Sequence, residues 1–300
     1  MNEITVLVLA FNRPDYLSAR LHELETNWNH EVNIFIDGGT DKNIRKTFNQ
    51  LESTFSSSKY KWYYRYSNFG VVKNLFSALE KIFDKYDACI VIEDDVKVSA
   101  SSLASMTKIL TDGISNEYFT VGAFGGLPSF STSLPKVFNP LRATPYFSAW
   151  GWGLKRNAWL QFENELASLD WDASKLDSPI WRKLNLHQRE IWASRFKKLQ
   201  SNVNFAWDYQ FQYFSFKNNL LNLLPVFRSG DNVGFNDARS TNTKLPRPRW
   251  YLGKSVCGFS TRILVSYFLT RIIVFLDSLT WAGDHKILKL RKKWKEILDY

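Results

Sequence analysis

At 300 residues the chain is long enough for one large domain or two, and its 45% of hydrophobic residues can build a sizeable core. The first residues lack the basic start and long apolar core of a signal peptide, and no uncharged stretch reaches the ~18 residues of a transmembrane helix. The net charge of +10 accompanies no nucleic-acid-binding motif, which argues against a nucleic-acid partner. Cys89 and Cys257 form no motif and fit a reducing compartment, so a cytoplasmic protein is expected.

Apolar runs alternate with amphipathic stretches over the first 125 residues. Strands are expected at residues 4–10, 32–36, 62–66, 89–92 and 119–124, and helices at residues 16–24, 41–54, 71–86 and 101–110. This alternation predicts an α/β fold whose mostly parallel, Rossmann-like sheet is flanked by helices. Because crossovers between parallel strands are right-handed, the loops after the strands gather at one edge of the sheet.

Three acidic residues, Glu93, Asp94 and Asp95, follow the apolar run that begins at Cys89. In open α/β sheets ligands bind beyond the carboxyl ends of the strands, so this strand would deliver the three carboxylates to the rim of a site. Adjacent carboxylates repel one another and need a counter-charge. Oxygen ligands favour Mg2+ or Mn2+, which predicts a metal site here. The alternative is an acidic loop that caps the next helix.

Other polar residues follow neighbouring strands at the same edge. Asn12 and Arg13 come after the first strand, and Asp37 comes after the second, just before two glycines. An acid in that position either meets a ribose or a base, or accepts bonds from the amides of its own turn. There is no Walker A sequence and no G-x-G-x-x-G, so a nucleotide would need a metal and arginine for its phosphates.

The second half of the chain begins with a Pro- and Ser-rich stretch at residues 127–144, which reads as a long loop, and continues with helices expected at 156–162 and 180–199. Trp150 and Trp152 alternate with glycines, which fits either stacking on a sugar or a tight crossing in the core. Asp208 is the only acid between Glu190 and Asp231 and lies among aromatic residues, so burial should raise its pKa and make it a proton acceptor. It could also cap a helix.

This ordered set resembles nucleotide-sugar glycosyltransferases of the GT-A fold over roughly residues 4–243. It is most similar to the N-acetylglucosaminyltransferase I type and to bacterial enzymes that build surface polysaccharides. The resemblance implies Asp95 as the metal ligand, Asp208 as the catalytic base, and donor contacts from Arg13, Asp37, Glu93 and Asp94. Asn12, Trp150 and Trp152 are further candidates for donor contacts, because of their places at the strand end and in the Gly-Trp-Gly segment. The sequence departs from the family pattern in two places. Tyr209 stands where the animal enzymes have a second acid, and residues 237–242 lack the histidine that bacterial relatives often carry there as a possible second metal ligand.

The resemblance implies an inverting, metal-dependent transfer from a nucleotide-sugar, with a UDP-sugar favoured, to a hydroxyl of a glycan or a lipid-linked saccharide. A single base opposite a single leaving group fits inversion by one displacement. Two other classes compete: a sugar-1-phosphate nucleotidyltransferase, which also uses strand-edge carboxylates, and a non-catalytic, membrane-associated glycan-binding protein.

The domain organisation expected is a catalytic domain at residues 1–243, with a nucleotide-binding half at 1–125 and an acceptor half at 126–243, followed by a basic helical extension at 244–300. This extension holds 12 Lys and Arg against 4 Asp and Glu. Its apolar stretch is interrupted by charges, which suits a helix lying on the inner face of the plasma membrane, bound to anionic lipid. The alternatives are packing on the catalytic domain and a homodimer interface.

Overall fold

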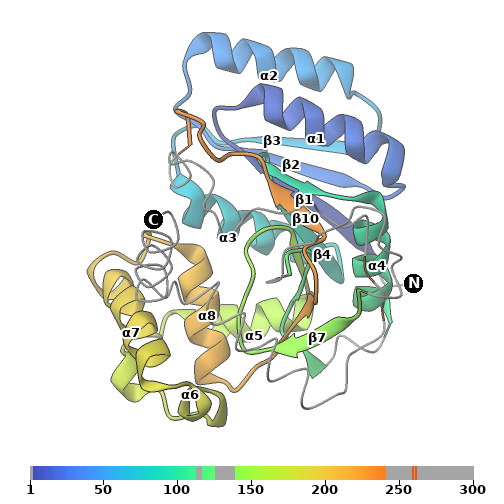
Figure 1. Cartoon of the computed structure of the whole chain (residues 1–300). Coiled ribbons are helices and arrows are strands. Elements are labelled where there is room, and N and C mark those ends of the chain that lie inside the picture. The colour runs from blue at the N-terminus through green and yellow to red at the C-terminus, as the bar shows by residue number, and fades with distance from the viewer. Residues whose placement is uncertain (1–2, 113–116, 126–138, 241–258, 260, 262–300) are drawn as a thin grey trace, which may run out of the picture.

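The computed structural model describes residues 3–112, 117–125, 139–240, 259 and 261. Within these residues an eight-stranded sheet carries helices on both faces (Figure 1). The strand order is β3-β2-β1-β4-β8-β6-β9-β7. The predicted α/β class with a mostly parallel sheet is confirmed.

The first half of the sheet is parallel throughout. Its strands are β1 (Ile4–Ala10), β2 (Val32–Ile36), β3 (Tyr60–Tyr64) and β4 (Ala88–Glu93). β1 and β2 have the predicted bounds, because both are continuous apolar runs buried on both faces. β3 begins two residues earlier than predicted.

The second half of the sheet mixes directions. Its strands are β6 (Val121–Gly122), β7 (Leu141–Thr144), β8 (Trp152–Lys155) and β9 (Asn222–Pro225). β8 runs antiparallel to β4 and β6, so the chain turns back beside the acidic strand. β5 (Val96–Val98) and β10 (Gly230–Asn232) form a separate antiparallel pair. β7 covers the last four residues of the stretch 127–144 that was predicted as a loop, so the loop prediction is wrong there.

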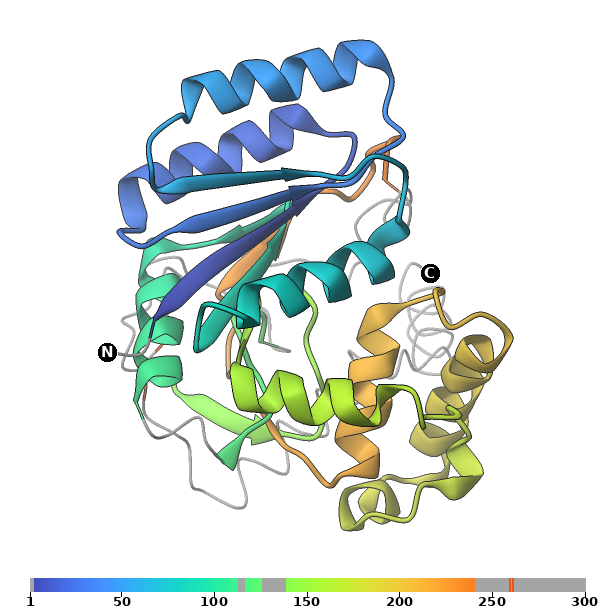
Figure 2. The same ribbon diagram turned by 180° about the vertical axis from the view of Figure 1, so that it is seen from behind.

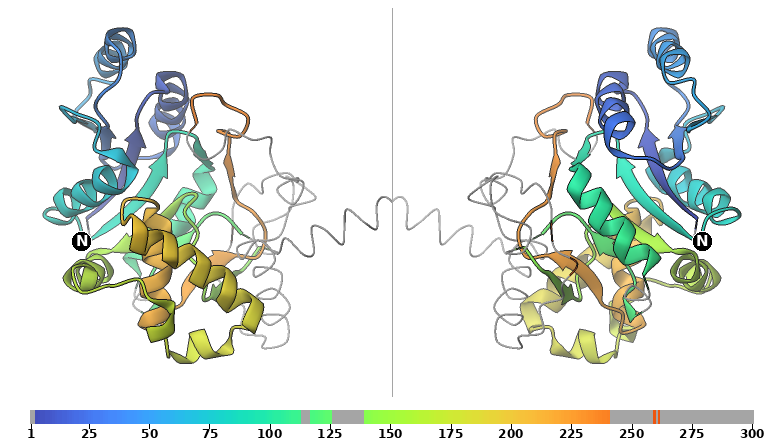
Figure 3. Two further views of the ribbon diagram at one scale, coloured as in Figure 1. Left: turned by 90° about the vertical axis from the view of Figure 1, so that its left-hand side faces the viewer. Right: turned by 90° about the vertical axis from the view of Figure 1, so that its right-hand side faces the viewer.

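The helices divide between the two faces of the sheet (Figure 2). One face is covered by α1 (Pro14–Asn27), α2 (Lys42–Thr54) and α4 (Ala100–Thr111). The other is covered by α3 (Gly70–Phe83), α5 (Arg156–Leu166), α6 (Pro179–Lys183), α7 (Leu186–Ser201) and α8 (Trp207–Lys217), with a 3₁₀ turn at Ala173–Lys175. α6, α7 and α8 lie at the end of the molecule away from α1 and α2 (Figure 3).

The single helix predicted over residues 180–199 is wrong, because the chain breaks it into α6 and α7. Asn185 has an extended backbone, its side chain accepts the amide of Gln188, and the Gln188 side chain accepts the amide of Asn185. This reciprocal capping box starts a new helix there.

Candidate functional site

A cleft of about 690 Å3 opens at the carboxyl ends of β1, β2 and β4. The start of α8 and the segment after β10 form its other walls. Eight of the nine site residues predicted from the sequence line this cleft: Asn12, Arg13, Asp37, Glu93, Asp94, Asp95, Trp150 and Asp208. The tertiary structure therefore brings together residues from both halves of the chain, as the sheet-edge argument requires.

Arg13 supplies positive charge to the acidic strand end. Its Nη1 donates to Asp95 Oδ2 at 2.9 Å, and its Nη2 donates to Asp94 Oδ1. The three side chains are 13%, 6% and 2% exposed, respectively, so this ion pair is shielded from solvent. Arg13, in the loop between β1 and α1, thus supplies at least part of the positive charge that the sequence analysis expected from a metal.

Asp95 keeps one carboxylate oxygen available to a cation. Its Oδ1 is buried and has no hydrogen-bond partner, and the part of the chain that the structure describes holds no group of three His, Cys, Asp or Glu able to bind a metal. Buried carboxylate oxygens without a partner are costly, and Mg2+ or Mn2+ would satisfy this one. Asp95 thus fits a single protein ligand to an ion whose other ligands come from phosphate and water.

Glycine is required where the segment after β10 crosses this cluster. A Cβ on Gly234 would lie 2.1 Å from Asp95 Oδ2 and 3.0 Å from Arg13 Nη1. The amide of Val233 donates to the Asp95 carbonyl at 2.8 Å, which holds the two segments together. The backbone around Gly234 therefore forms a close wall over the Arg13–Asp95 pair.

Burial sets the protonation of the first two acids. It raises the pKa of Glu93 to about 8, with further increases from the charges of Asp95 and Asp94. Burial also raises the pKa of Asp94, to about 7, although the nearby Arg13 opposes the shift. The raised pKa favours the protonated form of Glu93, which is able to donate a hydrogen bond.

Asp37 supports the local backbone. Its carboxylate accepts the amides of Gly38, Phe69 and Gly70 at 2.8–2.9 Å, and the residue is 5% exposed. Asp37 thus ties the end of β2 to the start of α3, which is the turn role that the sequence left open. It also lines the cleft, so a contact with a bound ligand is compatible with this role.

Asp208 lies across the cleft, as the second residue of α8. The N-cap of α8 is Ala206, so the alternative interpretation of Asp208 as an N-cap is wrong. Burial raises the pKa of Asp208 to about 6, and Arg195 on α7 partly opposes this rise. A carboxylate with such a pKa is ionised at neutral pH and is a stronger proton acceptor than a solvated aspartate.

The two tryptophans of the Gly-Trp-Gly segment have different environments. Trp150 lines the cleft, with its ring edge-on to Phe124 at 4.7 Å. Trp152 is fully buried in β8, stacked on Trp207 at 5.3 Å, and does not line the cleft. The predicted donor contact of Trp152 therefore needs correction: a strand side chain that points into the core cannot reach a ligand. Gly151, with φ of +72°, makes the turn between them.

Arg239 is a cleft residue that the sequence reasoning missed. Its guanidinium binds both oxygens of Asp15 at 2.7 and 3.0 Å and also binds Asp237 at 2.8 Å. The ring of Tyr16 lies 5.3 Å from the guanidinium of Arg13 and 5.2 Å from that of Arg239. Asp15 is 224 residues away in sequence, so no local signal pointed to this contact.

Asp231 and Asp237 are the next two acids after Asp208 in the chain. Arg239 holds the pKa of Asp237 well below its usual range, which makes that carboxylate a poor base. Asp231 lies in β10 opposite Lys97 and does not line the cleft. Both observations favour Asp208.

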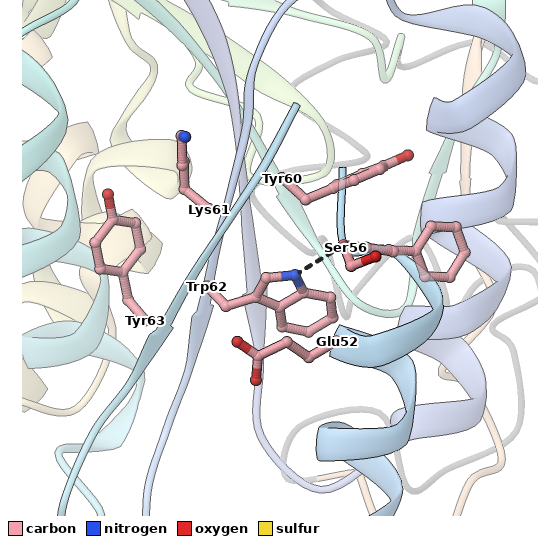
Figure 4. A pocket seen from close by; sticks show the side chains of 7 residues that line it. Glu52, Ser56, Tyr60, Lys61, Trp62 and Tyr63 are labelled. Atoms are coloured by element: carbon pink, nitrogen blue, oxygen red, sulfur yellow. Dashed lines mark hydrogen bonds between the residues drawn. The ribbon is translucent and has the colours of Figure 1, made fainter. Parts of the chain in front are cut away.

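A smaller hollow of about 320 Å3 lies between α2 and the edge strand β3 (Figure 4). Trp62 forms much of its wall, and its indole Nε1 donates to the carbonyl of Phe55 at 3.3 Å. Glu52 is the only acid that lines it, and Tyr64 already donates to that carboxylate. This hollow lacks the converging charges of the larger cleft.

No family model matches the sequence, and no curated protein matches it. Similar solved structures include GalNAc-T7 with UDP, GalNAc and Mn2+ (TM-score 0.42, 10% identity over 54% of this chain and 37% of that chain). They also include S. aureus TarS 1-349, with a TM-score of 0.43 and 13% identity over 76% of this chain and 58% of that chain. A third is a putative nucleotide-diphospho-sugar transferase from Desulfovibrio desulfuricans G20, with a TM-score of 0.38 and 10% identity over 84% of this chain and 93% of that chain. The chain spans well under two thirds of the length of the first two. At these identities and TM-scores, the reaction has to be inferred from the site itself.

Proposed function

We propose that the protein is an inverting glycosyltransferase that moves a sugar from a nucleotide-sugar, with a UDP-sugar favoured, to a hydroxyl of a glycan or lipid-linked saccharide. The observation that carries this proposal is the position of Asp208. An isolated carboxylate with a raised pKa shares one cleft with a cluster of Arg13, Asp94 and Asp95 at the opposite wall. One wall suits a diphosphate and the other suits a proton transfer.

The residues divide the reaction between them. Asp208 takes the proton of the acceptor hydroxyl as its oxygen bonds to the anomeric carbon. The bond from that carbon to the diphosphate breaks, and its electron pair leaves with the nucleotide. Arg13 would stabilise the charge that develops on the departing phosphate. Glu93 would form a hydrogen bond with the donor sugar.

The metal dependence belongs to the same proposal. Mn2+ or Mg2+ would be held by Asp95, and when bound it would neutralise the diphosphate. The free Oδ1 of Asp95 supports this assignment. Arg13 would then change partners as the phosphates enter.

The test is the metal-dependent release of UDP from a panel of UDP-sugars, first with water as acceptor. Asp208→Asn should keep donor affinity and lose turnover by ~10²–10⁴-fold, the range for removal of a general base. Asp95→Ala should abolish the metal-dependent part of UDP binding. Asp177→Asn, a surface change at a side chain that is 83% exposed, serves as the control. Full turnover in Asp208→Asn would refute the assigned base.

The same assay separates the competing classes. A sugar-1-phosphate nucleotidyltransferase would consume pyrophosphate and a nucleotide-sugar to make a nucleoside triphosphate. A glycan-binding protein without catalysis would release no nucleotide from any donor. Release of UDP without formation of a triphosphate supports the glycosyltransferase.

We infer a membrane role for the basic extension, which places the enzyme in the cytoplasm on the inner face of the plasma membrane in surface-polysaccharide synthesis. Nearly all of this extension lies outside the described residues, and no described helix is long and apolar enough to cross a bilayer. Phe259 is described: it is 1% exposed, and its carbonyl accepts a hydrogen bond from Ser105 on α4 at 2.7 Å. Phe259, from the extension, therefore packs in the hydrophobic core beside α4.

Liposome flotation tests the membrane role. A chain that ends at Thr261 keeps the Phe259 contact and removes the apolar and basic stretch. The full chain should float with anionic vesicles at low salt and lose this binding at high salt, while the shortened chain stays unbound. Equal behaviour of the two chains would favour a packing or homodimer role, which sedimentation of the full chain would then distinguish.

A further inference from the structure

A group of cationic and aromatic residues surrounds Phe205, which lines the cleft next to Asp208. We call it the acceptor rim and define it by Arg195, Lys198, Phe205 and Tyr209. Phe205 lines the cleft three residues before Asp208 and is 47% exposed. Large exposed aromatic side chains at the mouth of a polar cleft are typical of ligand contact.

The rim is built as a connected row of rings with cations beside them. The ring of Phe205 lies 6.1 Å from that of Tyr209, which lies 6.0 Å from the buried Trp192. Lys198 Nζ is 5.1 Å from the Phe205 centroid, and the Arg195 guanidinium is 5.5 Å from the Tyr209 centroid. Helix α7 thus holds both cations beside the aromatic rings of the rim.

Positive charge predominates around the rim. Residues 179–217 contain seven Lys and Arg but only two acids, Glu190 and Asp208. Two of the seven, Arg182 and Lys217, pair with Asp177 and Glu165 outside this range. Within the described part of the chain, Lys198 has no acidic partner within 4 Å, although many lysines and arginines elsewhere are paired. An uncompensated cation beside an exposed ring attracts an anionic ligand.

We propose that the acceptor is an anionic saccharide, which carries a carboxylate or phosphate close to the hydroxyl that receives the sugar. Its ring lies against Phe205, its anionic group faces Lys198 and Arg195, and its hydroxyl meets Asp208. This inference rests on the proposed function, and it names the acceptor class for the same site. A neutral acceptor would offer no charged group to the Lys198 ammonium.

The experiment measures binding by saturation-transfer NMR and calorimetry in the presence of UDP and Mg2+, which is diamagnetic and leaves the ligand signals sharp. Trigalacturonic acid is compared with its methyl ester, which has the same rings without charge. Glucose 6-phosphate and glucose form the second pair, so the two arms distinguish a carboxylate from a phosphate. Lys198→Gln and Phe205→Ala are tested with Lys183→Gln, an exposed lysine on α6, as the matched control.

We expect at least one anionic probe to bind ~10-fold or more tightly than its neutral partner, since a charge-assisted contact contributes ~1.5–3 kcal/mol. Lys198→Gln should remove most of that preference, Phe205→Ala should weaken the binding of both members of each pair, and Lys183→Gln should change neither. Equal binding within both pairs, no binding of either anion, full preference in Lys198→Gln, or unchanged binding in Phe205→Ala would overturn the inference.

Hydrolysis of the nucleotide-sugar by the unaltered protein is measured on the same preparation, because this reaction needs no saccharide acceptor. Hydrolysis without an anionic preference overturns the acceptor inference alone. Absence of hydrolysis with every donor overturns the proposed function instead.

Discussion

Replacing Asp37 by alanine should destabilise the whole domain, although the residue also lines the cleft. Its buried carboxylate accepts three backbone amides at 2.8–2.9 Å, two of them at the start of α3. A hydrogen bond to a charged group contributes ~1.5–3 kcal/mol, and the positive end of the helix adds ~0.3–1 kcal/mol. In the variant, water from the cleft can hydrogen-bond to some of the amides that lose Asp37. We therefore expect the free energy of unfolding to fall by ~3–5 kcal/mol rather than by the full sum.

Asp41→Ala provides the matched control, because Asp41 caps α2 through two amides at 2.8 and 3.0 Å on the exposed surface. An exposed cap of this kind is worth ~1 kcal/mol. Urea unfolding followed by tryptophan fluorescence gives both free energies, provided that the slope with denaturant is unchanged. If Asp37→Ala is no less stable than Asp41→Ala, the structural role assigned to Asp37 is wrong.

Three further predictions concern the cleft. Arg195→Gln should move the acidic limb of the kcat–pH profile, expected near pH 6, to higher pH, because Arg195 lowers the pKa of Asp208 and the base must be ionised; an unmoved limb would refute this coupling. Gly234→Ala should weaken UDP binding by ~10-fold or more, since its Cβ would meet the Asp95 carboxylate at 2.1 Å, and calorimetry with intact affinity would contradict it. Trp152→Ala should lower the free energy of unfolding by ~3–5 kcal/mol, as for a buried ring; a loss under ~1 kcal/mol in urea unfolding would show that the ring is not part of the core.

The sequence located the acidic strand end well because its signal is local. A run of apolar residues such as Cys89 to Ile92 forms a strand buried on both faces, and the residues directly after such a strand must emerge at the sheet edge. The same reasoning found β1, β2 and the loops that carry Arg13 and Asp37. It also recognised Asp208 as an isolated acid among aromatic residues, and the structure confirms that the residue is desolvated.

The sequence could not decide between two interpretations of the Gly-Trp-Gly segment, contact with a ligand and packing in the core. Trp150 and Trp152 flank Gly151, yet Trp150 lines the cleft and Trp152 is buried in the core. The pairing of β8 with β4 and β6 decides which side each ring faces, and the β4–β8 pairing joins residues more than sixty positions apart.

The sequence by itself determined the fold class, the parallel half of the sheet and the edge at which the acids gather, because strand periodicity and crossover handedness are local rules. Only the tertiary structure decided how the charges are balanced. Arg13 reaches Asp94 and Asp95 across 81 and 82 residues, and Arg239 reaches Asp15 across 224. Such ion pairs depend on where separate segments meet in space, and no propensity or spacing along the chain encodes that meeting.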